Sequence, residues 1–289
     1  MIISVLGAGT MGAGIAYVAA AAGMTVRLHD VDGSSLEAGL AAVRRDFDGA
    51  VSRGRLDDAE AAAGRERVHP ANDLAAAVGD ADVVVEAVVE DMAVKQQLLG
   101  EVGRLTPSGA VLATNTSALS VTQIMAALED PGRGLGMHFF NPVRAMRLCE
   151  LVLGLETRDA TVQIAEAAAQ AMGKTTVRVR DVAGFATSRI NAVIGNEAFF
   201  MLAEGVASAE DIDTAVRLGL NHPMGPLEMA DMVGLDVRLA VLSELRRSLG
   251  DKYRPAPLIQ TYVRAGRLGR KVGRGVYTYD ADGNKVTEG

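Results

Sequence analysis

The sequence at residues 7–12 reads Gly-Ala-Gly-Thr-Met-Gly, and its flanking segments are needed to interpret it. An apolar, β-branched run, Ile2-Leu6, precedes it, and an alanine-rich segment, Ala13-Ala22, follows it and ends at Gly23. In such a strand–turn–helix unit the first glycine permits the tight turn, the second lets the backbone approach a diphosphate, and the third lets the helix pack closely on the strand. The pattern therefore predicts a dinucleotide-binding unit at the start of the chain.

The next predicted strand, Thr25-Asp30, ends in an acidic residue. Asp30 lies 18 residues beyond Gly12, where a carboxylate accepts hydrogen bonds from the ribose hydroxyls and repels a 2′-phosphate. This arrangement favours NAD over NADP. The predicted cofactor-binding residues are Gly7, Gly9, Thr10, Met11, Gly12 and Asp30. Two other interpretations are a glycine-rich turn in another doubly wound fold and an S-adenosylmethionine site; Asp32 is instead expected to start the following helix.

The rest of the chain changes character about two-thirds of the way along. Up to about Val182, short apolar strands such as Asp82-Ala87 and Val111-Thr114 alternate with helical stretches. Near-continuous apolar strands between helices are typical of a mostly parallel sheet covered on both faces. Beyond that point the predicted elements are helices. We therefore predict an α/β fold of the Rossmann type, with a doubly wound, mostly parallel sheet in residues 1–182, followed by an all-helical C-terminal domain in residues 183–289.

The composition excludes several classes of function. The 289 residues carry a net charge of −7 and 49% hydrophobic residues, which is typical of a globular protein and opposite to the basic excess of a nucleic-acid-binding protein. One cysteine, Cys149, excludes an intrachain disulfide framework and a cysteine-based zinc cluster, and fits a reducing cytoplasm. Residues 1–26 have no charged side chain, but their five glycines argue against a signal peptide or a membrane span. We expect no metal, no nucleic acid and no membrane as a partner.

Four histidines are candidates for acid–base chemistry. His29 lies at a strand end and is expected at the surface, whereas His69 is expected in a connecting loop. His222 lies in a stretch with two prolines and a glycine, which predicts a rigid turn. His138 ends a predicted strand, Leu135-Phe139, and ligands of open α/β sheets bind beyond the carboxyl ends of strands. From its position alone, His138 fits a structural role better than a catalytic one.

Eight motifs occur along the chain in a characteristic order. They are GAGTMGAGI at residues 7–15, VVVEAVVEDMAVK at 83–95, ATNTSALS at 113–120, GMHFFNPV at 136–143, EDID at 210–213, NHPMGP at 221–226, GLDV at 234–237 and RAGRLGRKVGRGVY at 264–277. With these motifs the chain resembles the L-3-hydroxyacyl-CoA dehydrogenase family, particularly bacterial 3-hydroxybutyryl-CoA dehydrogenases, over nearly its full length. The resemblance implies NAD-dependent oxidation of an L-3-hydroxyacyl-CoA to a 3-ketoacyl-CoA.

The resemblance also implies a catalytic pair. His138 matches the family's histidine, and Glu150, 12 residues on, matches its carboxylate partner. Oxidation of a 3-hydroxyl needs a base that takes the proton as hydride leaves C3, and a carboxylate on the other ring nitrogen stabilises the imidazolium. Ser117 matches the serine that hydrogen-bonds the substrate oxygen, and Asn141 a position near the reacting centre. Without the resemblance, Glu150 is an acidic residue beside a strand, the Ser117 hydroxyl suits a turn, and Asn141 suits turn formation before a proline.

Further matches imply contacts with the nicotinamide cofactor. The matching residues are Glu90, Lys95, Asn115, Ser117, Asn141 and Lys271. From the residues alone, Glu90 and Lys95 equally suit a solvent-facing pair around a helix start. Asn115 suits a turn, and Lys271 suits the surface.

Three departures from the family pattern concern the substrate. Where the family commonly has the asparagine of PGFVVNR, this chain has Ser188, with a shorter reach and a hydroxyl in place of the amide. The helical hairpin expected to meet coenzyme A has Arg53 and Arg55 where lysines are usual, and arginine also binds a 3′-phosphate. Arg144 stands where proline is usual after HFFNP. We expect Arg144 to be a solvated surface residue; the alternatives are contact with the coenzyme A diphosphate or with a distal acyl carboxylate.

The sequence therefore predicts an NAD-dependent dehydrogenase of short-chain acyl-CoA substrates, with the helical domain completing the substrate site. The resemblance implies a homodimer, and the expected compartment is the cytoplasm. Alternatives are the same chemistry on 3-hydroxyadipyl-CoA or on a hydroxy acid without coenzyme A, and a non-catalytic nucleotide-binding protein of the same fold. The intact set of His138, Glu150 and Ser117 argues against the last of these.

Overall fold

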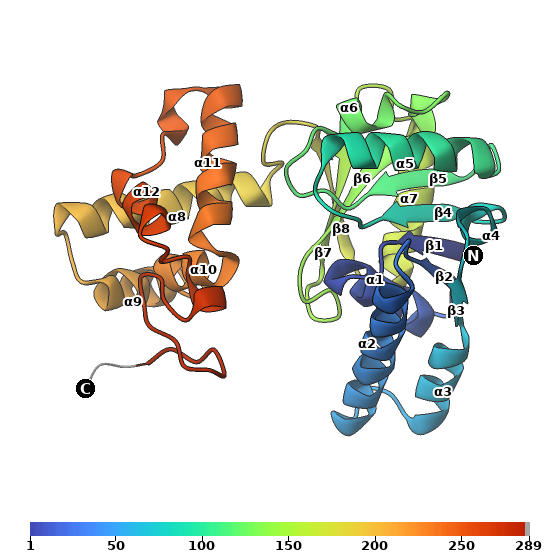
Figure 1. Cartoon of the computed structure of the whole chain (residues 1–289), viewed down its shortest axis with the longest axis horizontal. Coiled ribbons are helices and arrows are strands. Elements are labelled where there is room, and N and C mark those ends of the chain that lie inside the picture. Colours follow the sequence, from blue (N-terminus) through green and yellow to red (C-terminus); the bar gives the residue numbers. More distant parts are fainter. Residues whose placement is uncertain (287–289) are drawn as a thin grey trace. The chain divides into compact units, whose positions relative to one another are not determined.

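The computed structural model describes residues 1–286, which divide into two compact units (Figure 1). The first spans Met1–Val182, and the second begins at Ala183. Each has an apolar core of its own. The first unit contains a mostly parallel sheet with flanking helices and the second is helical, so the predicted fold class is confirmed. Within residues 1–286, no helix combines the length and the apolar character needed to cross a bilayer.

Residues 1–182 are built around an eight-stranded sheet. Its strands are β1 (Ile2–Leu6), β2 (Thr25–His29), β3 (Val68–Ala71), β4 (Val83–Glu86), β5 (Val111–Thr114), β6 (Gly134–Phe139), β7 (Leu148–Leu153) and β8 (Thr175–Arg180). They lie side by side in the order β3-β2-β1-β4-β5-β6-β7-β8. Neighbouring strands are parallel except β6 and β7, which are antiparallel. The connections change direction between β1 and β4, and such a switch point is where ligands bind in open α/β sheets.

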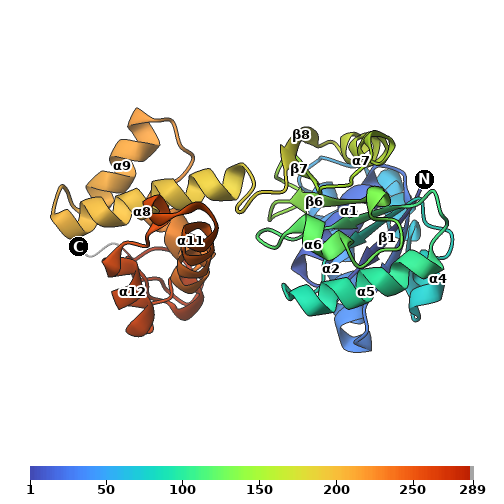
Figure 2. The ribbon, with the colours of Figure 1, turned by 90° about the horizontal axis from the view of Figure 1, so that it is seen from above.

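Helices cover both faces of this sheet (Figure 1 and Figure 2). They are α1 (Thr10–Ala21), α2 (Gly33–Ser52), α3 (Asp58–Glu66), α4 (Leu74–Val78), α5 (Met92–Leu105), α6 (Val121–Met125) and α7 (Asp159–Ala171), with the 3-10 turn η1 (Pro131–Arg133). The helices α1, α2 and α7 share one core with the strands, in which Ile15 and Phe47 are fully buried. Because the central strands are covered on both sides, they consist almost entirely of apolar residues.

Glycines let the first turn of α1 pack against β1. Gly7 has a φ of 97°, and a Cβ there would lie 2.7 Å from the backbone carbonyl oxygen of Ala87. A Cβ on Gly12 would overlap the carbonyl oxygen of Gly7. At Gly9, by contrast, no atom of the described chain beyond its immediate neighbours lies within 4 Å of a Cβ position. The three glycines therefore have separate roles. Gly7 permits the turn, Gly9 leaves the backbone open, and Gly12 permits the close contact between α1 and the turn.

The second unit consists of helices followed by short extended segments. The helices are α8 (Thr187–Glu204), α9 (Ala209–Gly219), α10 (Pro226–Val233), α11 (Leu235–Leu249) and α12 (Pro257–Arg264), with 3-10 turns η2 (Asp251–Tyr253) and η3 (Arg270–Val272). Two buried aspartates tie the last segment to the helices. Asp213 accepts a hydrogen bond from the Tyr277 hydroxyl at 2.8 Å, and Asp231 accepts one from the Tyr279 hydroxyl at 3.1 Å.

The structure differs from the sequence prediction between α2 and β4. His69 lies in the edge strand β3 and not in a connecting loop. His29 is half-buried rather than at the surface, and its Nδ1 lies 2.8 Å from the carbonyl oxygen of Ala71 in β3. The short segment Val68–Ala71 contains a proline and lacks alternation, so it is defined as a strand only by its pairing with β2.

Gly12→Ala should destabilise the protein, because the added methyl group has no space beside the Gly7 carbonyl. We expect a loss of about 1–3 kcal/mol in the free energy of unfolding, the usual range for overpacking, measured by urea denaturation. Gly9→Ala is the matched control, and its loss should stay below about 1 kcal/mol, the typical cost of alanine at a helix N-cap. Equal losses in the two variants would contradict the close packing at Gly12.

Candidate active site

A pocket of about 340 Å³ opens at the carboxyl ends of β1, β4, β5 and β6. It is lined by Met11, Ala87, Val88, Glu90, Lys95, Asn115, Ser117, His138, Phe139, Phe140 and Asn141. These residues end the strands or follow them, and parallel strands end at the same edge of a sheet. The structure therefore brings together in one pocket half of the residues that the sequence analysis selects for the cofactor and for catalysis.

His138 and Glu150 face each other across the antiparallel pair of β6 and β7. They are register partners, and Nδ1 of His138 lies 2.8 Å from Oε2 of Glu150. Glu150 is fully buried and His138 is 6% exposed. A carboxylate only accepts hydrogen bonds, so the proton of the neutral imidazole lies on Nδ1 and the lone pair on Nε2. This arrangement suits a histidine that takes a proton at Nε2.

Small residues in β6 position the loop that carries Ser117. Gly134 and Gly136 alternate with apolar residues along the strand and leave room for α6. A Cβ on Gly136 would lie 3.0 Å from Cγ2 of Val121, and one on Gly134 would lie 2.6 Å from Cγ of Met125. Because α6 follows directly on the Ser117 loop, this close packing determines where the loop lies relative to β6.

A buried charge network forms one wall of the pocket. Lys95 is 1% exposed and Glu86 is fully buried. The Lys95 ammonium lies 2.6 Å from Oε1 of Glu86 and 3.4 Å from Oε2 of Glu90. Lys95 is therefore not one half of a solvent-facing pair around a helix start. A buried ammonium requires such partners, because an uncompensated charge in the interior is costly.

Glu90 and Asn115 hold the loop after β5 in place. The Glu90 carboxylate accepts hydrogen bonds from the Thr116 hydroxyl at 2.5 Å and from the Ser117 backbone N–H at 3.1 Å. The Asn115 side-chain oxygen accepts one from the backbone N–H of Phe139 at 2.9 Å, which ties the end of β5 to the end of β6. Asn115 thus does more than form a turn.

The start of α1 fits the diphosphate of a dinucleotide. The helix begins after Gly9, and no side chain within residues 1–286 caps its first N–H groups. Uncapped N–H groups at a helix start attract an anion. Asp30, directly after β2, accepts hydrogen bonds from the N–H groups of Ala8 at 2.8 Å and Asp32 at 3.0 Å, and its remaining lone pairs suit ribose hydroxyls. The residues present therefore fit NAD.

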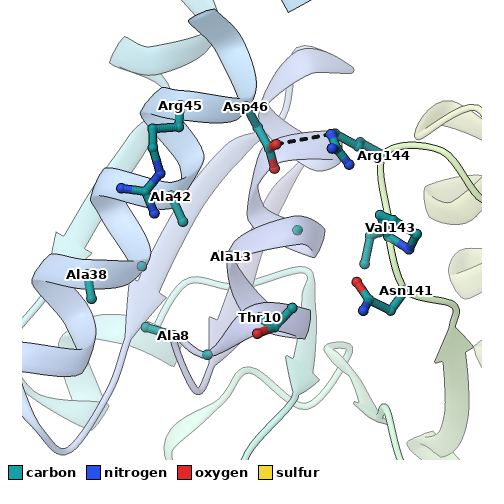
Figure 3. A pocket seen from close by; sticks show the side chains of 14 residues that line it. Ala8, Thr10, Ala13, Ala38, Ala42, Arg45, Asp46, Asn141, Val143 and Arg144 are labelled. Atoms are coloured by element: carbon teal, nitrogen blue, oxygen red, sulfur yellow. Dashed lines mark ion pairs between the residues drawn. The ribbon is translucent and has the colours of Figure 1, made fainter. Parts of the chain in front are cut away.

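A second pocket of about 520 Å³ lies beside the first (Figure 3). It is lined by the first turns of α1, by α2 and by the loop after β6, and the two pockets share Asn141. Arg45, Asp46 and Arg144 supply its charged groups. Arg144 is exposed, as expected for a surface residue, and its Nε lies 3.1 Å from Oδ1 of Asp46.

Seven of the selected substrate and cofactor residues line neither pocket: Gly7, Gly12, Asp30, Arg53, Arg55, Ser188 and Lys271. Arg53 and Arg55 are exposed at and just beyond the end of α2. Ser188 lies in the first turn of α8 and is half-buried. Lys271 lies in η3, where its ammonium is 2.7 Å from each carboxylate oxygen of Asp236.

Sequence reasoning misses two polar residues that support the walls of the site, Glu86 and Asp181. Glu86 ends a buried strand nine residues before Lys95, and an acidic residue in an otherwise apolar strand is the signal that marks it. Asp181 accepts hydrogen bonds from the N–H groups of Val121 at 3.0 Å and Thr122 at 2.7 Å. It has no local signal, because these partners are distant in the sequence. Among the described residues, no three side chains of His, Cys, Asp or Glu are gathered as a metal site.

Two family models match the chain. The first is described as 3-hydroxyacyl-CoA dehydrogenase, NAD binding domain, and matches residues 2–182. The second is described as 3-hydroxyacyl-CoA dehydrogenase, C-terminal domain, and matches residues 184–279. The boundary between the two matches coincides with the boundary between the two compact units.

Individual relatives are similar over nearly the whole chain. The chain is 44% identical over 279 residues to a probable 3-hydroxybutyryl-CoA dehydrogenase of Bacillus subtilis, covering 96% of this chain and 97% of the relative. It is 41% identical to the 3-hydroxybutyryl-CoA dehydrogenase of Bradyrhizobium diazoefficiens, covering 96% and 94%. The crystal structure of (S)-3-hydroxybutyryl-CoA dehydrogenase from Ralstonia eutropha superposes with a TM-score of 0.94 at 40% identity, covering 96% and 99%.

Lys95→Met should strongly destabilise the first unit, because it leaves the Glu86 charge buried without its partner. Removing one member of a buried ion pair usually costs about 3–5 kcal/mol. Urea denaturation followed by circular dichroism measures the loss.

Two further variants control for other effects of this change. The double variant Glu86→Gln/Lys95→Met removes both charges and should recover more than half of the lost stability. Lys271→Met breaks the exposed pair with Asp236 and should cost less than about 1 kcal/mol. If Lys95→Met costs as little as Lys271→Met, the charge network is not buried as described.

Proposed function

Because the chain belongs to the 3-hydroxyacyl-CoA dehydrogenase family and is an NAD-dependent oxidoreductase, we propose that it interconverts a short-chain L-3-hydroxyacyl-CoA, such as 3-hydroxybutyryl-CoA, and the corresponding 3-ketoacyl-CoA. The observation that carries the proposal is the His138–Glu150 pair, with His138 in the wall of the first pocket. The names of the relatives support a short acyl chain.

Oxidation of the substrate releases a proton from the 3-hydroxyl and a hydride from C3. When bound, NAD supplies the hydride acceptor. His138 takes the proton at Nε2, because its Nδ1 carries the proton that is hydrogen-bonded to Glu150. The Glu150 carboxylate then stabilises the imidazolium. In the reverse direction, His138 returns the proton to the ketone oxygen.

Other residues of the first pocket orient the reactants in this proposal. The Ser117 hydroxyl hydrogen-bonds the oxygen on C3, and Asn141 lies near the reacting centre at the boundary between the two pockets. Glu90, Lys95 and Asn115 contact the nicotinamide half of the cofactor. Their shared position in the pocket with His138 supports these roles.

The second unit is proposed to complete the substrate site and to form a homodimer. There, Ser188 contacts the substrate and Lys271 the cofactor, while Arg53 and Arg55 of the first unit bind the 3′-phosphate of coenzyme A. The family match that covers residues 184–279 supports a role of this unit in the same enzyme. The single cysteine, Cys149, is a buried free thiol, which fits the cytoplasm as the proposed compartment.

The purified protein should oxidise NADH when acetoacetyl-CoA is added, measured as loss of NADH absorbance. His138→Ala should lower kcat by at least about 100-fold, the usual contribution of a positioned acid–base group, with little change in NADH affinity. Glu150→Gln should lose part of this rate and move the pH profile of 3-hydroxybutyryl-CoA oxidation to lower pH, since an amide stabilises imidazolium less. A wild-type rate and profile in either variant would exclude the pair as the catalytic group.

Cofactor choice should depend on the charge of Asp30. The wild type should have a much higher kcat/KM with NADH than with NADPH, because a carboxylate at this position repels a 2′-phosphate. Asp30→Asn keeps an acceptor for the Ala8 N–H group and removes the charge, so it should narrow the difference. Equal kcat/KM for both cofactors in the wild type would show that Asp30 does not select NAD.

A further inference from the structure

We propose that Asp181 is a positioning residue for Ser117, to which the proposed function assigns the hydrogen bond with the oxygen on C3. Asp181 touches neither substrate nor cofactor in this proposal. Its carboxylate holds the end of the loop that carries Ser117, and its backbone is bonded to β7, the strand that carries Glu150. The inference rests on the proposed function, because it concerns the same reaction.

The loop between β5 and α6, which carries Ser117, is held near both ends by a carboxylate. Near its start, Glu90 accepts hydrogen bonds from the Thr116 hydroxyl and the Ser117 N–H group. At its end, the Ser120 hydroxyl donates a hydrogen bond to Oδ2 of Asp181 at 2.7 Å. Thr116 and Ser120 are only four residues apart, so a displacement of either held residue also displaces Ser117.

The Asp181 carboxylate uses both oxygens on the start of α6. Oδ1 accepts a hydrogen bond from the Val121 N–H group at 3.0 Å, and Oδ2 accepts one from the Thr122 N–H group at 2.7 Å. The next N–H group, that of Gln123, is capped locally by the Ser120 hydroxyl at 3.2 Å. A helix of five residues is not stable by itself. Because α6 already has a local cap, its bonds to a residue 60 positions away also determine where the helix begins relative to the sheet.

The backbone of Asp181 is joined to the strand pair that carries the acid–base residues. Its N–H group donates a hydrogen bond to the carbonyl oxygen of Leu153 at 3.0 Å. Leu153 ends β7, three residues beyond Glu150, and Glu150 is bonded to His138. Ser117 and His138 act on the same hydroxyl group of the substrate in the proposed reaction. Asp181 therefore joins the loop of one to the strands of the other.

The displacement expected after loss of these bonds is small. Ile124 of α6 is fully buried, and Glu90 still holds Thr116, so the loop keeps its general path. A misplacement of about 1 Å can lower an enzyme's rate about 100-fold. A smaller displacement of Ser117 should therefore lower the rate about tenfold.

A double-variant cycle with Ser117 tests the proposal. The measured quantity is kcat for reduction of acetoacetyl-CoA at saturating NADH. Asp181→Asn keeps the size of the side chain but replaces one acceptor oxygen by a donor, and it should lower kcat about tenfold. Ser117→Ala should lower kcat about tenfold or more, the usual effect of losing a hydrogen bond to a charged group. In the double variant, Asp181→Asn should add less than about twofold, whereas independent effects would multiply.

Asp181→Glu is the second variant, for the case that Asp181→Asn does not fold. It keeps the charge and both acceptor oxygens but lengthens the side chain, so it shifts the point at which α6 is held. Its kcat should fall less than that of Asp181→Asn. This smaller loss should also disappear when Ser117 is replaced by alanine, because it acts through the same hydroxyl.

Asp73→Asn is the matched control. Asp73 accepts a hydrogen bond from the Ala76 N–H group at 2.8 Å and caps α4, which also has five residues and lies in the same unit. Asp73 lines neither pocket. Its replacement should lower the Tm by about 2–4 °C, the usual effect of a lost cap in a domain of this size, and leave kcat at the wild-type value. A fall in kcat at Asp181 that is absent at Asp73 separates position from stability.

Four outcomes would overturn the inference while the wild type remains active. A wild-type kcat in both Asp181 variants would make this residue a cap without influence on the reaction. Losses that multiply with that of Ser117→Ala would show that Asp181 acts by another route. An equal fall of kcat in Asp73→Asn would attribute the effect to general destabilisation, and a wild-type kcat in Ser117→Ala would remove the residue that is positioned. If the wild type does not reduce acetoacetyl-CoA, the proposed function fails, and the inference fails with it.

Discussion

The hydrogen bond between His138 and Glu150 depends on the antiparallel pairing of β6 and β7 within an otherwise parallel arrangement. Residues directly opposite in such a pair have Cβ atoms about 4.5–5.5 Å apart, on the same face of the sheet. The register therefore places the carboxylate at the imidazole without the help of a loop. Both side chains are buried, and a buried carboxylate without a partner is costly. The His138–Glu150 hydrogen bond thus stabilises the pairing register of β6 and β7. As a result, this register constrains the path of the chain in the turn between the two strands.

This turn links the two pockets of the first unit. Asn141, near its start, lines both pockets, whereas Arg144 lines only the larger one. Lys174 holds the turn through two backbone carbonyl groups, and α1 packs against it through Gly14. His138, for which we propose acid–base catalysis, and Arg144 are therefore carried by neighbouring parts of one anchored segment.

The buried charges of Glu86 and Lys95 position the loop that carries Ser117 more than they stabilise the fold. Glu86 holds Lys95, Lys95 reaches Glu90, and Glu90 holds the backbone of the loop with Ser117. Replacing a buried ion pair with apolar residues is often neutral or stabilising. We therefore infer that the role of this network is to fix the positions of the segments that it joins. It joins the ends of β4 and β5 and the start of α5, and these are the elements that line the pocket with His138.

The features that the sequence by itself determined, the fold class and the cofactor, depend on interactions between residues that are close together in the chain. The glycines at residues 7–12, the acidic residue after the second strand and the helices after residue 183 depend on patterns within a few residues, so the fold class and the cofactor were predictable. Three other features were not predictable from the sequence: the strand β3, the burial of Lys95 and the Arg144–Asp46 pair. Each depends on which distant segments the sheet and its helices bring together, and burial and ion pairing exist only once that packing is complete. Only the tertiary structure decided them.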